Sequence, residues 1–432
     1  MLRLLFWNIV KFFVNIIRAL GLIKKNGPTR KYVKQEIADA RARLIDLRPY
    51  LDYVLNHQLD KSQYVPITDR PYVQGKKPVR PIAFYLPQFY QMPLNDDWHE
   101  RGFTEWFNAA KAVPQYIDHW QPHLPIDVGF YNLDTTNVMR RQIELAKMYG
   151  VYGFCFYYYW FSGTRLMETP IFNLLADKSL DIPFMLFWAN EDWTKEWGTK
   201  SNLGEKFYDA KIKPGDAERF VDDIMPFWSD KRYIRIEGRP ALVVYKYKKD
   251  PSVSKFINDI KQICLDRGQP APYVMVPDEG DVPEFHPKNL NADAVVEFTT
   301  HLRNPLRLLP NPPKIINTRG DMLFADMEWY INSGRHIYDI EWPLFKGAMT
   351  TFDNTARRLY IGGGLICKVT PELYHKWLSD IVQWTQEHGH RDGFVFISAW
   401  NEWAEGMHLE PDQKYGYAYL EMTKKALEDN NA

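Results

Sequence analysis

The spacing of short apolar segments constrains the fold of this chain more than any other feature. Eight such segments follow Pro78, and we predict that each is a strand: Pro81–Leu86, Tyr152–Tyr157, Pro183–Trp188, Ala241–Tyr245, Tyr273–Pro277, Ala294–Phe298, Ala348–Phe352 and Gly393–Ala399. Amphipathic stretches with helical spacing separate several of them: Thr135–Tyr149, Pro214–Trp228, Val253–Arg267 and Pro371–Glu387. Apolar strands that alternate with helices indicate a parallel sheet covered on both faces. We therefore predict an α/β fold, a (β/α)8 TIM barrel, over residues 78–432.

A doubly wound open sheet is the alternative arrangement of parallel strands and helices. Such a fold typically carries a G-x-G-x-x-G turn after a strand, where it binds a dinucleotide. No such turn follows any predicted strand, and the glycine run Gly362–Gly364 is more typical of a tight turn. The barrel is therefore the favoured fold.

A pair of acidic residues follows the last predicted strand, where barrel enzymes place their functional side chains. Glu402 and Glu405 stand three residues apart, so on a helical turn both project to one face. Glycosidic-bond chemistry requires a proton donor and a second group on the anomeric side, and two carboxyls with different pKa values meet that need. We predict that both are catalytic. The alternative is that one of them caps a helix or pairs with an arginine.

Aromatic and polar residues gather near the predicted strand ends and are candidates for binding a saccharide. Aromatic rings can stack on a sugar, and amide or carboxylate groups can bond its hydroxyls. The predicted substrate-binding residues are Tyr85, Gln88, Trp106, Tyr157, Tyr159, Trp188, Asn190, Glu191, Asp192, Trp193, Tyr245, Asp278, Asp353, Trp400, Asn401 and Trp403. Core packing is the alternative for Trp400 and Trp403. Of the consecutive tyrosines Tyr157–Tyr159, only alternate members can face the site.

The composition argues against several other classes of function. Lys and Arg together number 54, as do Asp and Glu, so no net positive field favours nucleic acid. The three cysteines are widely spaced and show no C-x-x-C pattern, so neither a disulfide framework nor a zinc site is predicted. The acidic pair Glu191–Asp192 has no histidine at ligand spacing. We expect no metal and no cofactor.

The first 77 residues form two predicted segments ahead of the barrel. Residues 1–25 are apolar with basic interruptions at Lys11 and Arg18 and contain no acidic residue, which predicts a basic amphipathic helix. The uncharged runs are too short for a membrane span, so we expect binding to an anionic membrane surface through residues 2–25. Docking of this helix on the barrel is the alternative. Residues 26–77 are predicted to be a helical neck or linker. The expected location is cytoplasmic, on the inner face of the membrane.

Four motifs together give the chain a family resemblance. They are AFYLPQFYQMPLNDDWHERGFTEW, YGFCFYYYWFSG, FWANEDWTKEW and WNEWAEG, at residues 83–106, 152–163, 187–197 and 400–406. In order and content they resemble WbsX-type proteins of polysaccharide and lipopolysaccharide biosynthesis, which have a domain similar to glycoside hydrolase family 99. The resemblance extends over about residues 79–427.

This resemblance implies a (β/α)8 barrel and a retaining, metal-independent attack on α-linked, mannose-like glycans. It implies that Glu402 assists the substrate's 2-hydroxyl and that Glu405 is the general acid and base. Ala404 stands where the hydrolases usually have histidine, which bears on sugar specificity. The implied partner is an oligosaccharide or a lipid-linked glycan. A glycosyltransferase of O-antigen or capsule biosynthesis and a non-catalytic, membrane-tethered glycan-binding protein are the alternatives.

Overall fold

The computed structural model describes residues 59–194, 206–247, 252–278, 287–298, 302, 306–317, 322–358, 364–388 and 392–430. The predicted amphipathic helix and the first part of the predicted neck therefore lie outside the described residues. Residues 59–77 contain no helix. Instead, Val65 forms a bridge with Gly416, and Tyr72 packs against the main core. This part of the predicted neck is thus attached to the barrel domain, near its C-terminal residues. In the described part of the chain, no helix combines the length and apolarity that crossing a membrane requires.

One large sheet organises the domain, and its strands run in the order β12-β10-β9-β8-β4-β2-β1-β15-β13. Their bounds are β1 Arg80–Tyr85, β2 Gly153–Phe161, β4 Phe184–Trp188, β8 Arg239–Val244, β9 Tyr273–Pro277, β10 Ala294–Val296, β12 Leu344–Phe345, β13 Gly347–Met349 and β15 Phe394–Ser398. Neighbours along this order are parallel. Lys346 alone separates β12 from β13, so the two ends of the order meet at one residue. The sheet is a nearly closed, TIM-barrel-like sheet, which confirms the predicted fold.

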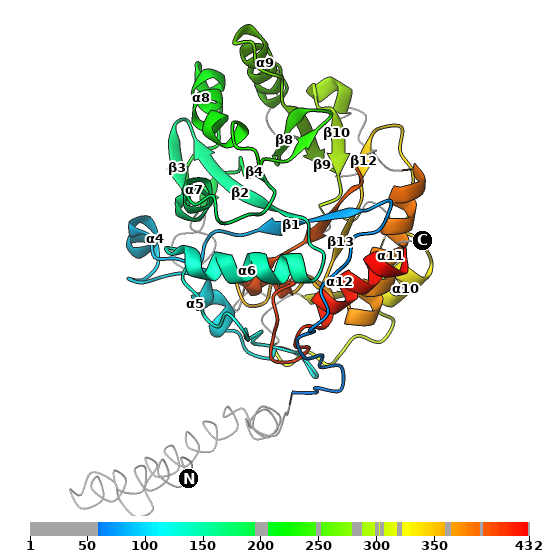
Figure 1. Cartoon of the computed structure of the whole chain (residues 1–432). Helices are drawn as coiled ribbons and strands as arrows, with labels where there is room; N and C mark the ends of the chain where they lie inside the picture. Colours follow the sequence, from blue (N-terminus) through cyan, green and yellow to red (C-terminus); the bar gives the residue numbers. More distant parts are fainter. Residues whose placement is uncertain are drawn as a thin grey trace, which may run out of the picture. The chain divides into compact units, whose positions relative to one another are not determined.

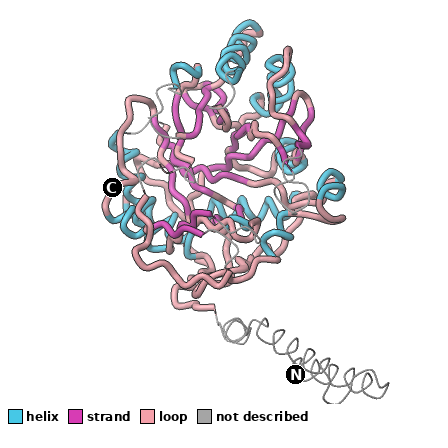
Figure 2. Tube along the Cα trace, turned by 180° about the vertical axis from the view of Figure 1, so that it is seen from behind, coloured by secondary structure: helices cyan, strands magenta, loops and turns pink. Residues whose placement is uncertain are grey.

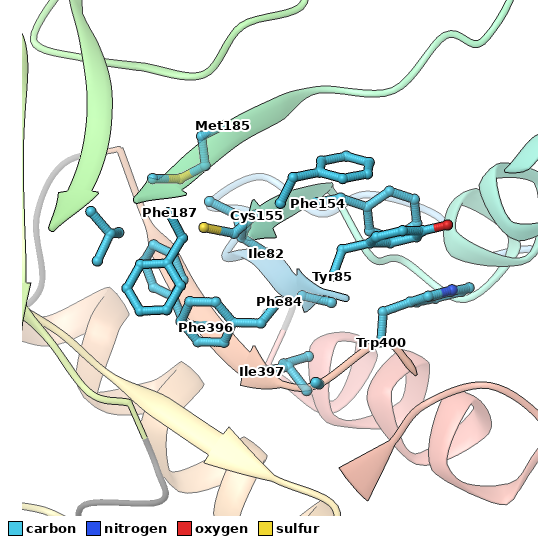
Figure 3. Packing of buried hydrophobic residues seen from close by; sticks show 14 of the residues in the cluster. Ile82, Phe84, Tyr85, Phe154, Cys155, Met185, Phe187, Phe396, Ile397 and Trp400 are labelled. Carbon is cyan, nitrogen blue, oxygen red and sulfur yellow. The ribbon is translucent and has the colours of Figure 1, made fainter. Parts of the chain in front are cut away.

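The barrel interior is filled by aromatic rings from several strands. Phe84 of β1 lies 5.5 Å from Phe187 of β4 and 5.1 Å from Phe298, which follows β10. Phe84 also lies 5.5 Å from Phe396 of β15. Figure 3 shows Phe84, Phe187 and Phe396 together, with Tyr85 turned away from them. Rings from strands far apart in the sheet order meet only if the sheet curves around them, so these contacts define the inside of the barrel.

Helices surround the strands (Figures 1 and 2), and the longer ones each bury one stripe of side chains. Four match the predicted helices closely: α6 Thr136–Met148, α8 Asp216–Trp228, α9 Ser252–Asp266 and α11 Pro371–His388. The others are α4 Pro93–Trp98, α5 Glu105–Ala110, α7 Thr169–Ala176, α10 Met327–Asn332 and α12 Ala418–Asp429. In α8, Phe220, Ile224 and Phe227 are buried at helical spacing, as the amphipathic pattern predicts. Burial of such a stripe against the strands is what holds each helix in place.

Short strands and turns shape the loops around the barrel. The short strands are β3 Thr164–Leu166, β5 Trp193–Thr194, β6 Lys206–Tyr208, β7 Arg235–Ile236, β11 Met322–Ala325, β14 Gly364–Cys367, β16 Asn401–Glu402 and β17 Met407–His408. Two 3-10 turns are η3 Pro287–Leu290 and η4 Trp403–Glu405. Gly364, the last residue of the predicted glycine turn, begins β14 with a φ of 68°. The hairpin β16-η4-β17 carries the predicted catalytic pair.

A buried ion pair marks the place where the sheet order ends. Lys346 is fully buried, and its Nζ lies 3.1 Å from Glu297 Oε1. Glu297 Oε2 accepts a hydrogen bond from the Gly347 backbone at 2.6 Å. The ammonium also lies 3.5 Å from the centre of the Tyr338 ring. The charged groups thus bridge β10 to the break between β12 and β13. The seventh strand begins at Leu344 rather than at the predicted Ala348, because Lys346 interrupts the apolar run and hides the start of the strand in the sequence.

Candidate active site

Asn401 fixes the hairpin that carries the two glutamates to the first barrel strand. Its Oδ1 accepts from the Leu86 backbone N–H at 2.7 Å, and its Nδ2 donates to the Leu86 carbonyl at 2.9 Å. The Asn401 side chain is fully buried. A side chain held in this way cannot bond a sugar hydroxyl, so the predicted substrate-binding role of Asn401 is wrong. Its amide instead aligns the β15 end with β1.

Gly406 ends the η4 turn in a conformation that favours glycine. Its φ is 62°, and a Cβ added there would lie 3.1 Å from His123 Cε1. The His123 Nδ1 in turn pairs with His408 Nε2 at 3.0 Å. The turn therefore rests directly on a buried pair of imidazoles. This support holds Glu402 and Glu405 at one end of the barrel.

Arg357 brings three carboxylates together at that end. It lies in the loop after β13, and its Nε lies 2.7 Å from Glu105 Oε1. Its Nη2 lies 2.9 Å from Glu402 Oε2, and its Nη1 contacts Glu405 Oε1. We call Glu105, Arg357, Glu402 and Glu405 the carboxylate cluster. The predicted pair thus shares a single cation, which is the arginine-pairing alternative that the sequence left open. Sequence analysis missed both Glu105 and Arg357.

The carboxylate cluster holds more negative than positive charge. Burial raises the pKa of Glu402, with Arg357 opposing the rise and the neighbouring Glu405 and Glu105 adding to it. Burial also raises the pKa of Glu405, which Arg357 opposes and Glu105 reinforces. One guanidinium faces three carboxyl groups, so Glu402 and Glu405 hold a proton more readily than exposed glutamates do. A protonated carboxyl beside an ionised one is the arrangement that acid–base catalysis requires.

Two of the three consecutive tyrosines of β2 lie on the side of the carboxylate cluster. Burial raises the pKa of the Tyr157 hydroxyl, and the charges of Glu402 and Glu405 raise it further. Tyr159, which is half-buried, responds to Glu402 in the same direction after burial. Tyr158 points the opposite way and contacts Asp223 of α8. Tyr157 and Tyr159 therefore share the strand face that carries the site.

Glu191 lies at the partly exposed margin of the carboxylate cluster. Burial raises the pKa of Glu191, Lys246 opposes the rise, and Glu405 contributes to it. Its carboxylate lies 3.9 Å from Lys246 Nζ, and 42% of its side chain is exposed. Glu191 is thus a predicted site residue that the structure brings close to the catalytic candidates while leaving it open to solvent.

Trp400 and Trp403 are core residues, which corrects their predicted substrate-binding role. Both are fully buried. Trp400 Nε1 donates to Glu410 Oε1 at 3.1 Å, and Trp403 Nε1 donates to Glu410 Oε2 at 2.7 Å. Gln142 and Tyr131 donate to the same carboxylate at 2.6 and 2.9 Å. The two indoles therefore pack around the buried Glu410 carboxylate. Sequence analysis missed Glu410.

Strand alternation explains why Tyr85 and Trp188 also miss the site. Each follows an inward-pointing phenylalanine, so each points outward to the helices. Tyr85 Oη donates to Gln142 Oε1 of α6 at 2.7 Å, and Figure 3 shows its ring beside Phe154. Trp188 Nε1 donates to the Trp160 carbonyl at 3.1 Å. The predicted substrate contacts of Tyr85 and Trp188 are therefore wrong.

Four other predicted residues are occupied by contacts within the protein. Trp106 is buried and donates to the Tyr131 carbonyl at 2.8 Å. Asn190 is buried and bonds both the N–H and the carbonyl of Lys246, at 2.8 and 2.7 Å. Asp278 is buried and accepts from Tyr338 Oη at 2.9 Å, on the side of the Lys346–Glu297 pair. Their side chains stabilise loops, and the predicted substrate contacts of Trp106, Asn190 and Asp278 stay predictions.

Asp353, the fourth of these, contacts the loop that carries Glu405. It is buried and lies 2.5 Å from His119 Nε2. The His119 Nδ1 accepts from the Gln115 backbone at 2.9 Å, so the Nε2 carries the proton and donates it. The Asp353 backbone N–H donates to the Glu405 carbonyl at 2.7 Å. Asp353 therefore contacts the backbone of Glu405, and its predicted substrate contact stays a prediction.

The remaining predicted residues lie around the barrel mouth. The Gln88 carbonyl accepts from the Glu105 backbone at 2.9 Å, and Gln88 is half-buried. Tyr245 packs 5.7 Å from Phe298 at the top of the aromatic interior. Asp192 Oδ1 accepts from the Ala210 backbone at 2.9 Å. Trp193 lies 5.4 Å from Tyr159. No group of three or more His, Cys, Asp or Glu side chains in the described ranges is arranged to hold a metal ion.

Comparison with known sequences relates the chain to one family. Residues 81–423 match the family described as Glycosyltransferase WbsX. Two relatives, each described as "Uncharacterized protein WxcX" and belonging to Xanthomonas campestris pv. campestris strains B100 and ATCC 33913, are 36% identical over 360 residues. Each match covers 81% of this chain and 50% of the relative. The chain therefore spans about half the length of these relatives.

Solved structures with a similar fold include glycoside hydrolases. A "Glycoside hydrolase-like protein" aligns with a TM-score of 0.52 at 12% identity, over 86% of this chain and 99% of that one. The GH99 endo-alpha-mannosidase from Bacteroides thetaiotaomicron aligns with a TM-score of 0.50 at 12% identity, over 81% of this chain and 97% of that one. At these identities the likeness concerns the fold, and it agrees with the nearly closed barrel described above.

Proposed function

The chain belongs to the WbsX glycosyltransferase family of carbohydrate-active enzymes, and from this premise we propose that it acts on α-linked, mannose-like glycans. We propose the reaction of a retaining glycoside hydrolase or transglycosylase, with Glu402 and Glu405 as the catalytic residues. The observation that supports this choice is the carboxylate cluster, in which three carboxyl groups share one guanidinium. Such a cluster holds both a proton to donate and a base to receive one.

The proposed reaction assigns one proton transfer to each glutamate. The Glu402 carboxylate takes the proton of the sugar 2-hydroxyl, and the freed oxygen attacks the anomeric carbon. The bond from that carbon to the leaving oxygen breaks, and Glu405 gives its proton to that oxygen. The attack closes a three-membered ring of the 2-oxygen, the carbon that bears it and the anomeric carbon. An incoming water or sugar hydroxyl then opens this ring at the anomeric carbon and gives its proton to Glu405, while Glu402 returns a proton to the 2-oxygen. Glu405 has the more exposed side chain, 15% against 6% for Glu402, which suits contact with a leaving group.

Arg357 supports a second candidate function, a glycan-binding protein without turnover. The guanidinium contacts both proposed catalytic carboxylates, and only 12% of its side chain is exposed. If this contact persists when a glycan binds, neither carboxylate is free to transfer a proton. The proposed enzyme therefore requires that the saccharide competes with Arg357 for at least one oxygen of Glu405. The family description adds a third candidate, transfer from a nucleotide sugar.

Product analysis distinguishes the three candidates. The wild type and Glu405→Gln are incubated separately with a panel of α-linked oligosaccharides, lipid-linked glycans and nucleotide sugars. Shorter products from wild type alone support hydrolysis, and longer products support transglycosylation. Consumption of a nucleotide sugar, with no reaction of the glycans, would replace the proposal with glycosyl transfer. Binding by both proteins without any product would favour the glycan-binding protein.

We also propose that residues 2–25 bind the inner face of the cytoplasmic membrane. The support is the sequence alone, in which residues 2–25 are mostly apolar, contain basic residues at intervals and include no acidic residue. Vesicles with anionic lipids should sediment the full chain and not a variant lacking residues 1–25. Equal sedimentation of the two proteins would contradict the proposal.

A further inference from the structure

We propose that Trp98, Tyr159, Trp193 and Tyr208 form a second sugar-binding subsite beside the carboxylate cluster. The four rings come from α4, β2, β5 and β6, and we call them the aromatic row. The inference deepens the proposed function and rests on it, because the row would hold a sugar next to the one that reacts. Its consequence is that the substrate is a neutral oligosaccharide rather than a single activated sugar.

The rings of the aromatic row form a continuous series of contacts. Tyr159 lies 5.4 Å from Trp193, Trp193 lies 6.0 Å from Trp98, and Trp98 lies 6.1 Å from Tyr208. These distances join ring centres, and the planes are inclined by 52 to 66°. Four separate segments of chain thus converge to place aromatic surface at one location.

The direction of β2 connects the aromatic row to the carboxylate cluster. Tyr157, Tyr159 and Phe161 stand at alternate positions and share one face of the strand, each step advancing about 6.6 Å. Tyr157 lies over the barrel interior, 6.2 Å from Phe84. Phe161 lies 5.2 Å from Tyr208 at the far end of the row. The row therefore begins beside the site and extends away from it along the strand.

Partial exposure separates the aromatic row from the aromatic core. Trp400 and Trp403 are fully buried and donate their indole N–H groups to Glu410. The four rings of the row are each only half-buried. Half-exposed rings in a group present apolar faces with polar edges, the surface on which the C–H face of a sugar stacks. Packing of the β5–β6 hairpin against α4 is the competing explanation for these contacts.

The charge beside the row selects the class of sugar. Glu191, with 42% of its side chain exposed, also acts electrostatically on the Tyr159 hydroxyl. A carboxylate in this position accepts hydrogen bonds from hydroxyls and repels an anionic group. Lys246 lies 3.9 Å from this carboxylate and offsets part of its charge, but the four rings of the row offer no cation, so a neutral hexose fits them better than a uronic acid or a sugar diphosphate.

The test compares substrates of increasing length. A ladder of α-linked manno-oligosaccharides, from disaccharide upward, is given to the wild type, Trp98→Ala, Trp98→Phe and Tyr208→Ala. We expect Trp98→Ala and Tyr208→Ala to lower kcat/KM about tenfold for the longer members and to leave the disaccharide unchanged. Trp98→Phe keeps a ring and should restore most of the loss. The control is Phe130→Ala, which removes an exposed ring that lies against Trp106.

A binding measurement separates failure of this inference from failure of the proposed function. Glu405→Gln, alone and combined with Trp98→Ala, is titrated with the same ladder by calorimetry. If the wild type turns over the ladder but Trp98→Ala affects every length equally, the subsite is wrong and the proposed function stands. If no member reacts, calorimetry still decides: an affinity that rises with length only when Trp98 is present supports the subsite. No binding of any member by Glu405→Gln overturns the subsite and the proposed function together. Thermal unfolding of each variant identifies losses caused by misfolding.

Discussion

Arg357 Nε lies 2.7 Å from Glu105 Oε1, so the arginine of the site is held by a carboxylate outside the predicted catalytic pair. The contact joins α5 to the loop after β13 across 252 positions of sequence. It leaves the Nη1 and Nη2 atoms of Arg357 directed at Glu405 and Glu402. Glu105 therefore determines where the positive charge stands, and Arg357 determines how the two acids share a proton.

Replacing Arg357 with leucine should destabilise the protein in a pH-dependent way. The change leaves three buried carboxyl groups without a cation, and removal of one partner from a buried ion pair costs about 3–5 kcal/mol. Carboxyls without the cation gain protons more readily, so the loss should be large at pH 7.5 and smaller at pH 5. Urea unfolding of the wild type and the variant at the two pH values measures this loss of stability. Arg358→Leu is the control, since Arg358 is the exposed neighbour; equal losses at both pH values for Arg357→Leu would contradict the charge argument.

Glu405→Gln should abolish turnover and preserve glycan binding. The amide cannot donate a proton to a leaving oxygen, and loss of a general acid lowers kcat about 10²–10⁴-fold. Steady-state kinetics and calorimetry on one substrate measure the two effects separately. Wild-type turnover in this variant would remove Glu405 from the mechanism.

Glu402→Gln should reduce kcat as severely as Glu405→Gln does. The proposed reaction needs the Glu402 carboxylate to accept the 2-hydroxyl proton, which an amide cannot do. A substrate analogue lacking the 2-hydroxyl should be inert with the wild type as well. If Glu402→Gln keeps most of the activity, Glu402 is a binding residue only.

The pH profile of kcat/KM should have a basic limb well above the ordinary range of a glutamic acid. Burial raises the pKa of Glu405, so the proposed acid keeps its proton above pH 4.5, and the basic limb falls as the pH rises through that raised value. Burial also raises the pKa of Glu402, so the proposed base is protonated on the acidic side and the profile has an acidic limb as well. Arg357 lowers these pKa values, so Arg357→Leu should move the basic limb to higher pH. A basic limb near pH 4.5, or one that does not move in that variant, would disagree with the described electrostatics.

Glu410 should make the protein less stable as the pH rises toward neutrality. Burial raises its pKa to about 7, whereas an unfolded glutamate titrates near ~4.3. The folded state therefore binds this proton more tightly, and the free energy of unfolding falls between about pH 4.5 and pH 7, by on the order of 3 kcal/mol. Glu410→Gln should flatten that part of the curve and lower stability at every pH, because its amide nitrogen faces donors. Urea unfolding across pH 5 to 8 compares the two slopes, and an unchanged slope would assign the titration elsewhere.

Lys346→Met should destabilise the barrel by about 3–5 kcal/mol, because it leaves Glu297 buried without its cation. Adding Glu297→Gln should recover part of the loss, since the amide oxygen can still accept from the Gly347 backbone. The double-mutant cycle is read by urea unfolding. Additive losses in the double variant would mean that the two side chains do not stabilise each other.

The elements that the sequence predicts well are those with a local pattern. Helix α8 follows from apolar residues at helical spacing, and β9 follows from a short apolar run. The prediction starts the seventh strand four residues late because Lys346 interrupts its apolar run, and the partners that accommodate this lysine, among them Glu297 and the His336 carbonyl, are distant in sequence. A strand that depends on a distant ion pair carries no local signal of its start.

The site residues also differ in whether a local sequence pattern reveals them. Glu402 and Glu405 stand three residues apart in the sequence and could be singled out, while Glu105 and Arg357 reach them only through the fold. For Trp188 the needed information was present: Phe187 and Trp188 are consecutive in a strand, so one of them must point outward. Composition alone could not decide which.

Strand β1 pairs with β15, and Arg80 stands opposite Phe394. The ribosome therefore completes β1 some three hundred residues before it makes β15, the strand that pairs with the second edge of β1. Throughout that interval the nascent chain presents an apolar strand with an open row of backbone donors and acceptors, which invites pairing with other chains. Loss of the final strand by premature termination would leave this hazard permanent.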